Sequence, residues 1–378
     1  MPERRLPDYG GKCFAALPGR IEELLASGHE RVVLVYFDAF GWSLFERHGG
    51  HRFFAEAQVE CWTSQFPSTT TVHTTTIHTG LPVGEHGLYE WHVYEPRLER
   101  LITPLWFCFA GESDRNTLHA AGLDPAELFP FPTLYERLDV PAHIASPASI
   151  TFSPPSRRLQ TGGILHAFEH TAQGLELLAG AIAAEERAYG TIYLPDLDWL
   201  MHQEGPGSPG VAPLIEETLT ALHTAPWPEG TLVLLTADHG MSAISPERTA
   251  YVNVLWPELP EHLVTGADGK PLAPAGSARD LFLHVLPDRL DETAARLGEL
   301  LEGRADVEHV ETLVAAGAFG PSVSERLRTR LANLVVLPHP GEAAYWFEPG
   351  RFEQRFRGQH GGLSPEEMEI PLVAWVAP

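Results

Sequence analysis

Four short and almost wholly apolar segments constrain the fold of this chain more than any other feature. They lie at 32–37, 192–194, 232–235 and 370–376. Continuous apolar runs of this length are typical of strands buried on both faces of a parallel sheet. Helix-length segments separate them, at 22–26, 70–78, 165–188 and 214–223. The alternation predicts an α/β fold with a mainly parallel sheet flanked by helices.

A different pattern follows Gly276. Residues 281–286, 307–310 and 334–337 are typical of strands, and residues 291–301 and 323–331 of helices. We therefore predict a small α+β insertion over 249–357, placed before the last strand of the main sheet. Residues 1–248 plus 358–378 would form the main domain, and 378 residues are enough for this arrangement. Segments rich in Pro and Gly predict loops at 153–156, 204–213 and 266–276.

The charge balance excludes some classes of function. With 26 Lys and Arg against 50 Asp and Glu, the net charge is −24, which argues against binding long nucleic acids or anionic membranes. The sequence has no apolar run long enough to span a bilayer and no apolar secretory signal. Three cysteines without a C-x-x-C pair favour a reducing compartment, so we expect the cytoplasm. Bound metal ions would supply the positive charge that an anionic substrate needs.

Three of the apolar segments run into aspartate. The first ends at Asp38, the second reaches Asp196 and Asp198, and the third is followed by Asp238. Ligand sites in open α/β sheets form at the carboxyl ends of the strands, so these carboxylates are expected to converge. One such aspartate is usually a helix cap or a turn residue. Three of them, two with histidines nearby, favour a metal site.

Histidines lie close enough in sequence to two of these aspartates to bind a metal ion together with them. Asp198 and His202 are four residues apart and would share one face of a helix. His239 directly follows Asp238, so the two could face one ion from two sides, serve two ions, or leave His239 as a cap. His360 lies between glycines, just before a predicted capping box at 364–367. Asp and His without Cys suit Zn²⁺, Mn²⁺ or Fe²⁺.

A threonine-rich segment at 66–80 is the second signal. Seven of the eleven residues from 69 to 79 are threonine. The simplest interpretation is a threonine-rich helix with a Ser or Thr cap, although threonine is a mediocre helix former. The functional interpretation is a hydroxyl at a helix start, where free N–H groups and the dipole hold a phosphate. Near a divalent cation, such a hydroxyl loses its proton more easily and becomes a nucleophile.

Taken in order, these motifs resemble a known family. They are Asp38, F-P-S-x-T with T-G-L and H-G over 66–87, D-x-x-x-H-x-x-G-P over 198–206, D-H-G at 238–240 and G-x-H-G at 358–361. The set is similar to the type I phosphodiesterase/nucleotide pyrophosphatase family of the alkaline phosphatase superfamily. The resemblance implies an alkaline-phosphatase-like fold and two divalent ions, zinc or alternatively manganese, that share the substrate phosphate. It assigns one ion to Asp198, His202 and His360, and the other to Asp38, Asp238, His239 and Thr70.

The family pattern also selects the nucleophile. In the family it follows F-P-x-x and precedes T-G-L by nine residues, which points to Thr70, with Thr69 as the alternative. Asp198 fits the D-x-x-x-H spacing and Asp196 does not, so Asp196 is expected behind the ligands or in a turn.

Departures from the pattern concern the substrate. Family members have a base-stacking Phe after the nucleophile, where this chain has Thr71; the second aromatic is kept as Tyr193. No asparagine occurs between Thr70 and Arg115, although the family places one on the phosphate near Glu90 and Trp91. His92 or the Thr71 N–H could replace it. We take Thr71, Tyr193, Trp91 and His92 as candidate substrate-binding residues, with Trp91 alternatively a core aromatic.

The expected function is therefore hydrolysis of phosphate diesters or nucleotide pyrophosphates through a phosphothreonine on Thr70. A phosphomonoesterase or phosphonate hydrolase on the same site is the alternative within this class. A non-catalytic metal-binding relative is the alternative outside it. The expected partner is a small phosphate ester or nucleotide, not a long nucleic acid or a membrane; the sequence does not determine the oligomeric state.

Overall fold

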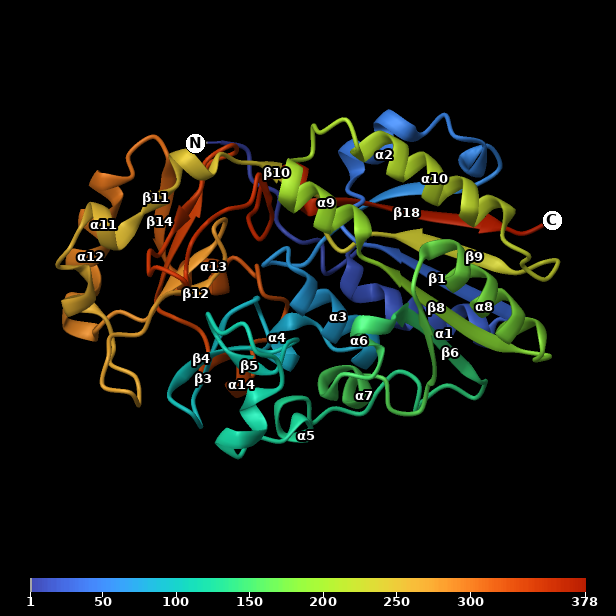
Figure 1. Ribbon diagram of the computed structural model, residues 1–378, viewed down its shortest axis with the longest axis horizontal. Coiled ribbons are helices and arrows are strands. Elements are labelled where there is room, and N and C mark those ends of the chain that lie inside the picture. Colours follow the sequence, from blue (N-terminus) through green and yellow to red (C-terminus); the bar gives the residue numbers. More distant parts are fainter. Residues whose placement is uncertain (1) are drawn as a thin grey trace.

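Seven strands form the main sheet of the protein in a computed structural model that describes residues 2–378 (Figure 1). Their order is β2 (Gln58–Thr63), β18 (Glu369–Val376), β9 (Leu232–Thr236), β1 (Arg31–Phe37), β8 (Ala188–Leu194), β6 (Ala142–Pro147) and β7 (Ile164–Phe168). The strands from β9 to β7 are parallel, and β18 runs antiparallel to both β9 and β2. The predicted α/β fold with a mainly parallel sheet is confirmed.

Helices cover both faces of this sheet. On one face α8 (Thr171–Ala183) packs on β6 and β8, beside α10 (Val211–Thr224), which in turn contacts α9 (Asp196–Glu204). On the other face α1 (Leu17–Ala26) packs on β1 and contacts α3 (Thr70–Thr79). The central strands β1 and β9 are therefore buried from both sides, which explains their continuous apolar sequences.

Three local predictions were wrong. The segment 165–188 is not one helix, because β7 occupies its first residues and α8 begins only at Thr171. The predicted loop at 153–156 starts a helix instead, α7 (Pro154–Leu159), with the Ser153 side chain as its cap. The capping box at 364–367 does not form. Ser364 Oγ donates to Glu367 Oε2 at 2.7 Å, since that carboxylate is held by an arginine from the insertion.

A second sheet lies within 249–357, at the left of Figure 1. It is antiparallel, in the order β12 (Ala275–Gly276), β13 (Leu281–Leu283), β15 (Leu334–Pro338) and β14 (Ala305–His309), with α12 (Leu290–Leu300), α13 (Val310–Ala315) and α14 (Glu325–Arg328). Its apolar core continues into residues outside the insertion, for example where Phe66 packs on Phe282 and Phe319.

The remaining elements are short. They are α2 (Trp42–His48), α4 (Val83–His86), α5 (Pro125–Leu128), α6 (Ala148–Thr151), α11 (Val252–Leu255), α15 (Pro365–Met368), β3 (Val93–Glu95), β4 (Arg100–Thr103), β5 (Cys108–Phe109), β10 (Ser242–Ala243), β11 (Ala250–Tyr251), β16 (Ala344–Tyr345) and β17 (Gly358–Gln359). Six short 3₁₀ turns complete the part of the chain that the structure describes. Within residues 2–378, no helix is both long and apolar enough to cross a membrane.

A buried ion pair joins the predicted insertion at 249–357 to the C-terminal segment of the chain. Arg279 donates from Nε to Glu367 Oε1 at 3.0 Å and from a terminal nitrogen to Glu367 Oε2 at 2.8 Å. The two side chains are 1% and 0% exposed. A bidentate pair with this burial is strong only while both partners are present, because either one alone is an unpaired buried charge.

We therefore expect Glu367→Gln to lower the free energy of unfolding by about 3–5 kcal/mol, measured by urea denaturation. The matched control is Glu299→Gln, since the Arg296–Glu299 pair is largely exposed and should contribute little. Equal stability of the two variants would contradict the importance of the buried pair.

Candidate metal centre

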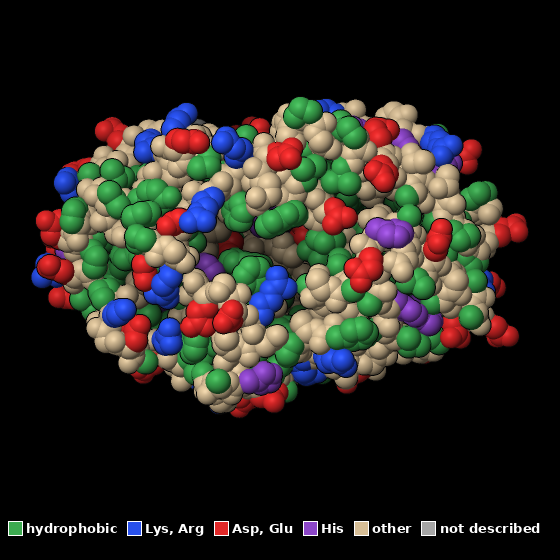
Figure 2. Space-filling model, viewed as in Figure 1, with side chains coloured by type: hydrophobic (Ala, Val, Ile, Leu, Met, Phe, Trp, Pro, Cys, Tyr) green, Lys and Arg blue, Asp and Glu red, His purple; other side chains and the backbone are tan. Residues whose placement is uncertain are grey.

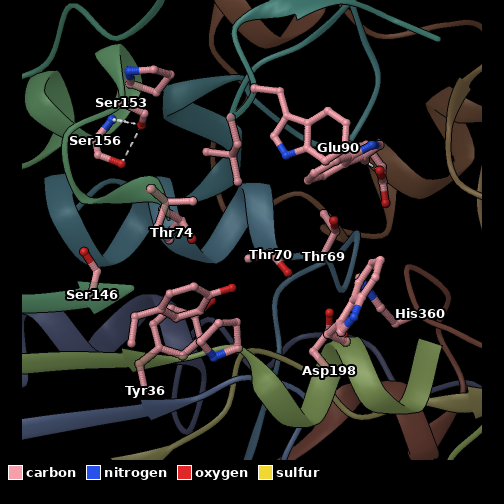
Figure 3. A pocket seen from close by; sticks show the side chains of 18 of the residues that line it. Tyr36, Thr69, Thr70, Thr74, Glu90, Ser146, Ser153, Ser156, Asp198 and His360 are labelled. Atoms are coloured by element: carbon pink, nitrogen blue, oxygen red, sulfur yellow. Dashed lines mark hydrogen bonds and ion pairs between the residues drawn. The ribbon is translucent and has the colours of Figure 1, made fainter. Parts of the chain in front are cut away.

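The carboxyl ends of three adjacent strands bring the candidate ligands together. In the sheet β1 lies between β9 and β8, so Asp38, Asp238 with His239, and the first turns of α9 share one edge. His360 reaches this edge from the loop between β17 and α15, and Thr70 is the first residue of α3. Figure 3 shows Thr70, Asp198 and His360 around one space.

The ligands form two groups, each of which could hold an ion. In the first, Asp198 Oδ1 is 3.3 Å from His202 Nε2 and 3.7 Å from His360 Nε2. In the second, His239 Nε2 is 3.6 Å from Asp38 Oδ1 and 3.2 Å from Asp238 Oδ2. The groups are neighbours, because the rings of His239 and His360 stack with centroids 3.6 Å apart.

Hydrogen bonds fix the tautomer of all three histidines. Nδ1 of His202 faces the carbonyl oxygen of Gly358 at 2.8 Å, Nδ1 of His239 that of Gly240 at 2.9 Å, and Nδ1 of His360 that of Ser68 at 2.8 Å. A carbonyl only accepts, so Nδ1 carries the proton and donates. Each Nε2 then has a free lone pair directed into the site, which is the usual arrangement of metal-binding histidines.

Two buried carboxylate oxygens without hydrogen-bond partners indicate whether a metal ion would fit the site. Asp38 Oδ1 and Asp198 Oδ1 are buried and have no hydrogen-bond partner, although each faces a histidine Nε2. A buried anion without a donor is costly. Nitrogen and carboxylate ligands in sets of three suit a divalent cation of the zinc or manganese type. These residues therefore fit two metal ions.

The carboxylates also act on each other. Burial, together with the neighbouring Asp238 and Asp198, raises the pKa of Asp38 well above its usual value. Burial raises the pKa of Asp238 too, but the adjacent His239 outweighs it and holds that pKa below the ordinary range. The site thus lacks positive charge, which a divalent cation would supply.

Two tyrosines donate hydrogen bonds to these carboxylates. Tyr36 donates its hydroxyl to Asp238 Oδ2 at 2.8 Å, and Tyr193 donates to Asp38 Oδ2 at 2.5 Å. Sequence analysis missed Tyr36, although its position two residues before Asp38 in the same strand is a usable signal. Tyr193 lines the neighbouring cavity, and its hydroxyl orients a candidate ligand as well.

Thr70 lies where the two groups meet. Its Oγ1 is 3.4 Å from His239 Nε2, and it begins α3, whose first N–H groups have no partner within the helix. Thr69 is the residue before the helix and is almost fully buried. Other hydroxyls of the threonine-rich segment bond back within α3, as Thr75 does to the Thr71 carbonyl at 2.8 Å.

Two glycines allow the ligand loops to approach one another. A Cβ on Gly240, directly after His239, would overlap the backbone carbonyl of Glu366. Gly361, directly after His360, has a φ of 125°, and a Cβ there would lie 2.5 Å from Asp280 Oδ1. Glycine is thus required at both positions for close packing.

A cavity of about 510 Å³ opens beside Thr70. Figure 2 shows the corresponding hollow in the middle of the molecule, with acidic side chains at its floor. Of the candidate substrate-binding residues, Tyr193, Trp91 and His92 line it, whereas Thr71 is fully buried and its side chain is not among the lining residues. Lining residues that sequence analysis missed are Leu105, Trp106, Arg115, Ile150, Trp199 and Phe356. Four of them come from loops, Ile150 lies in α6, and Trp199 lies in α9 next to the ligand Asp198, within the D-x-x-x-H motif.

Comparisons with known proteins identify the family and agree with the fold. A model of the type I phosphodiesterase / nucleotide pyrophosphatase family matches residues 32–363. No curated protein sequence matches the chain. Murine ectonucleotide pyrophosphatase / phosphodiesterase 5, as an inactive variant in complex with AMP, superposes with a TM-score of 0.67 at 16% identity, covering 91% of this chain and 87% of that one. Phosphonoacetate hydrolase from Sinorhizobium meliloti 1021, in complex with phosphonoformate, gives 0.60 at 18% identity, with 92% and 90% covered.

The fold and the family match define a hydrolase of the alkaline phosphatase superfamily, and the two ligand groups are its candidate metal sites. The family model, which matches residues 32–363, identifies a narrower group of enzymes than this class. The protein belongs to the type I phosphodiesterase/nucleotide pyrophosphatase family.

Replacement of one aspartate in either group of metal ligands should abolish binding of one of the two metal ions. We expect Asp198→Asn and Asp238→Asn each to halve the zinc bound per chain after reconstitution, because each loses an anionic ligand. Asp196→Asn is the control, since that carboxylate is exposed. Elemental analysis of the three variants measures this. Unchanged metal content in Asp198→Asn would contradict the assignment.

Proposed function

We propose that the protein hydrolyses phosphate diesters or nucleotide pyrophosphates through a phosphothreonine intermediate on Thr70. The position of the Thr70 hydroxyl carries the proposal, because it lies 3.4 Å from His239 Nε2, at a helix N-terminus and beside the cavity. The inactive murine relative, a threonine-to-alanine variant, supports a threonine in this role.

Two metal ions are part of the proposal. Asp198, His202 and His360 would hold one, and Asp38, Asp238, His239 and Thr70 the other, with zinc as the first choice and manganese as the alternative. Bound there, the ions would lower the pKa of the Thr70 hydroxyl and neutralise charge on the phosphate and its leaving oxygen.

The residues of the chain set the geometry of the reaction. Thr70 Oγ1 attacks phosphorus, forms the new O–P bond and displaces the leaving group in line. The free N–H groups at the start of α3 donate to the phosphoryl oxygens. Water then enters from the side that the leaving group vacated, breaks the Thr70–phosphorus bond and releases the phosphate product. Tyr36 and Tyr193 keep the aspartates oriented throughout.

Substrate contacts outside the phosphate are proposed for Trp91, His92 and Tyr193, which line the cavity. Thr71 would contribute through its backbone N–H in the first turn of α3 rather than through its buried side chain. A small phosphate ester or nucleotide fits a cavity of about 510 Å³ better than a long nucleic acid does.

Two further points belong to the proposal. All candidate ligands lie in 1–248 plus 358–378, which supports a catalytic domain with an insertion at 249–357. Cys13, Cys61 and Cys108 are free thiols, which supports a cytoplasmic location.

Replacement of the nucleophile tests the central step. With bis-p-nitrophenyl phosphate as substrate, Thr70→Ala should lower kcat by about 1,000-fold or more while metal content stays unchanged. Thr69→Ala is the matched control and should keep most of the activity. Loss of activity in Thr69→Ala with retention in Thr70→Ala would instead identify Thr69 as the nucleophile.

A substrate panel separates the proposed function from its alternatives. The zinc- and manganese-loaded enzyme should cleave the diester faster than p-nitrophenyl phosphate or phosphonoacetate, as measured by released nitrophenol or phosphate. Faster release from the monoester or the phosphonate would favour a phosphomonoesterase or a phosphonate hydrolase. Bound metal without any hydrolysis would favour a non-catalytic relative.

A further inference from the structure

A second pair of buried carboxyl groups lies beside Thr70, outside both metal-ligand groups. Glu90 stands between α4 and β3, and Asp280 stands between β12 and β13. Both side chains are 0% exposed. Glu90 also lines the cavity together with Thr69 and Thr70, and Figure 3 shows it above these threonines.

Each carboxyl group has one satisfied oxygen and one that is unpartnered. Glu90 Oε2 accepts from the N–H of Trp91, and Asp280 Oδ1 accepts from Ser277 Oγ at 2.6 Å. Glu90 Oε1 and Asp280 Oδ2 are buried without any partner. The two side chains are close enough to interact directly.

Within residues 2–378, no Lys or Arg side chain forms a salt bridge with Glu90 or Asp280. Arg279 is the nearest arginine in sequence, but it donates to both oxygens of Glu367 and to the carbonyls of His339 and Glu342, the latter two at 2.7 Å. Among the residues that line the cavity, Arg115 is the one Lys or Arg, and it stacks 4.4 Å from the Trp106 ring.

Two close carboxyl groups in a buried site cannot both stay ionised, so they retain a proton. Burial raises the pKa of Glu90 to about 8, and burial together with Glu90 raises that of Asp280 well above its usual value. The proton turns one unpartnered oxygen from an acceptor into a hydroxyl donor.

We propose that Glu90, as the neutral acid, donates a hydrogen bond to a phosphoryl oxygen of the substrate at Thr70. This inference rests on the proposed function. An ionised Glu90 would repel the phosphate, whereas a neutral carboxyl group supplies a donor directed at charge that grows in the transition state. Only a hydrogen bond is involved, and no proton is transferred.

Glutamine at position 90 makes the inference testable, because its amide is neutral and donates without a titratable proton. With bis-p-nitrophenyl phosphate, Glu90→Gln should keep kcat within about threefold of wild type, while Glu90→Ala should lower kcat about 100-fold with little change in KM. Metal content and Tm of each variant show that the site and fold are intact. Glu95→Gln is the control, since Glu95 is buried in an ion pair with Arg330 but does not line the cavity; it should lower Tm and leave kcat unchanged.

The outcomes separate this inference from the proposed function. A loss in Glu90→Gln as large as in Glu90→Ala would show that Glu90 acts as an anion, and full activity of Glu90→Ala would show that it has no role; either overturns the proposal. If the wild-type enzyme hydrolyses no phosphate ester, the proposed function fails. Binding of orthovanadate to the zinc-loaded protein then decides: weaker binding in Glu90→Ala alone supports the hydrogen bond, and equal binding in all variants overturns it.

Discussion

Electrostatic repulsion among carboxylates at the ends of three strands is the constraint on which the rest of this structure depends. Asp38, Asp198 and Asp238 meet in a space from which water is largely excluded. Such a cluster is stable only with compensating donors and cations. The tyrosines of β1 and β8 donate to Asp238 and Asp38, and three oriented histidines direct their Nε2 atoms into the same space. The chemistry of the family follows from the positive charge that this arrangement still requires.

The loop that carries His360 shows how the peripheral parts support the centre. Ser68 binds this loop with four hydrogen bonds. Its carbonyl accepts from His360 Nδ1 at 2.8 Å and its Oγ accepts from the Gly361 N–H at 3.1 Å, while its Oγ and N–H donate to the carbonyls of Gly362 and Gly361. The same loop is fixed from the other side by the Arg279–Glu367 pair, because Glu367 Oε1 also accepts from the Gly362 N–H at 3.1 Å. The insertion therefore contributes to the site through packing, although it supplies no candidate metal ligand.

The acidity of the chain is consistent with an anionic substrate once its carboxylates are divided by role. Most of the 50 acidic side chains contribute to a net charge of −24. A few are buried at the cavity, where burial raises the pKa of Asp38, Glu90 and Asp280. Arg115 is the one Lys or Arg among the lining residues, so the phosphate site that we propose would depend on bound cations rather than on basic side chains.

The sequence by itself determined the fold class and the candidate ligands, because buried parallel strands leave long apolar runs and their ends carry the functional residues. It also separated Asp198 from the exposed Asp196 by spacing alone. The sequence-based prediction was wrong where a local pattern competes with a distant partner. Ser364 and Glu367 have the pattern of a capping box, but the Glu367 carboxylate binds Arg279, which lies 88 residues away in the chain. Only the tertiary structure decided that Thr70 faces His239, that Tyr193 orients Asp38, and that Glu90 meets Asp280. These contacts join segments far apart in the chain, and no periodicity or motif within one segment encodes which distant side chain will share its buried space.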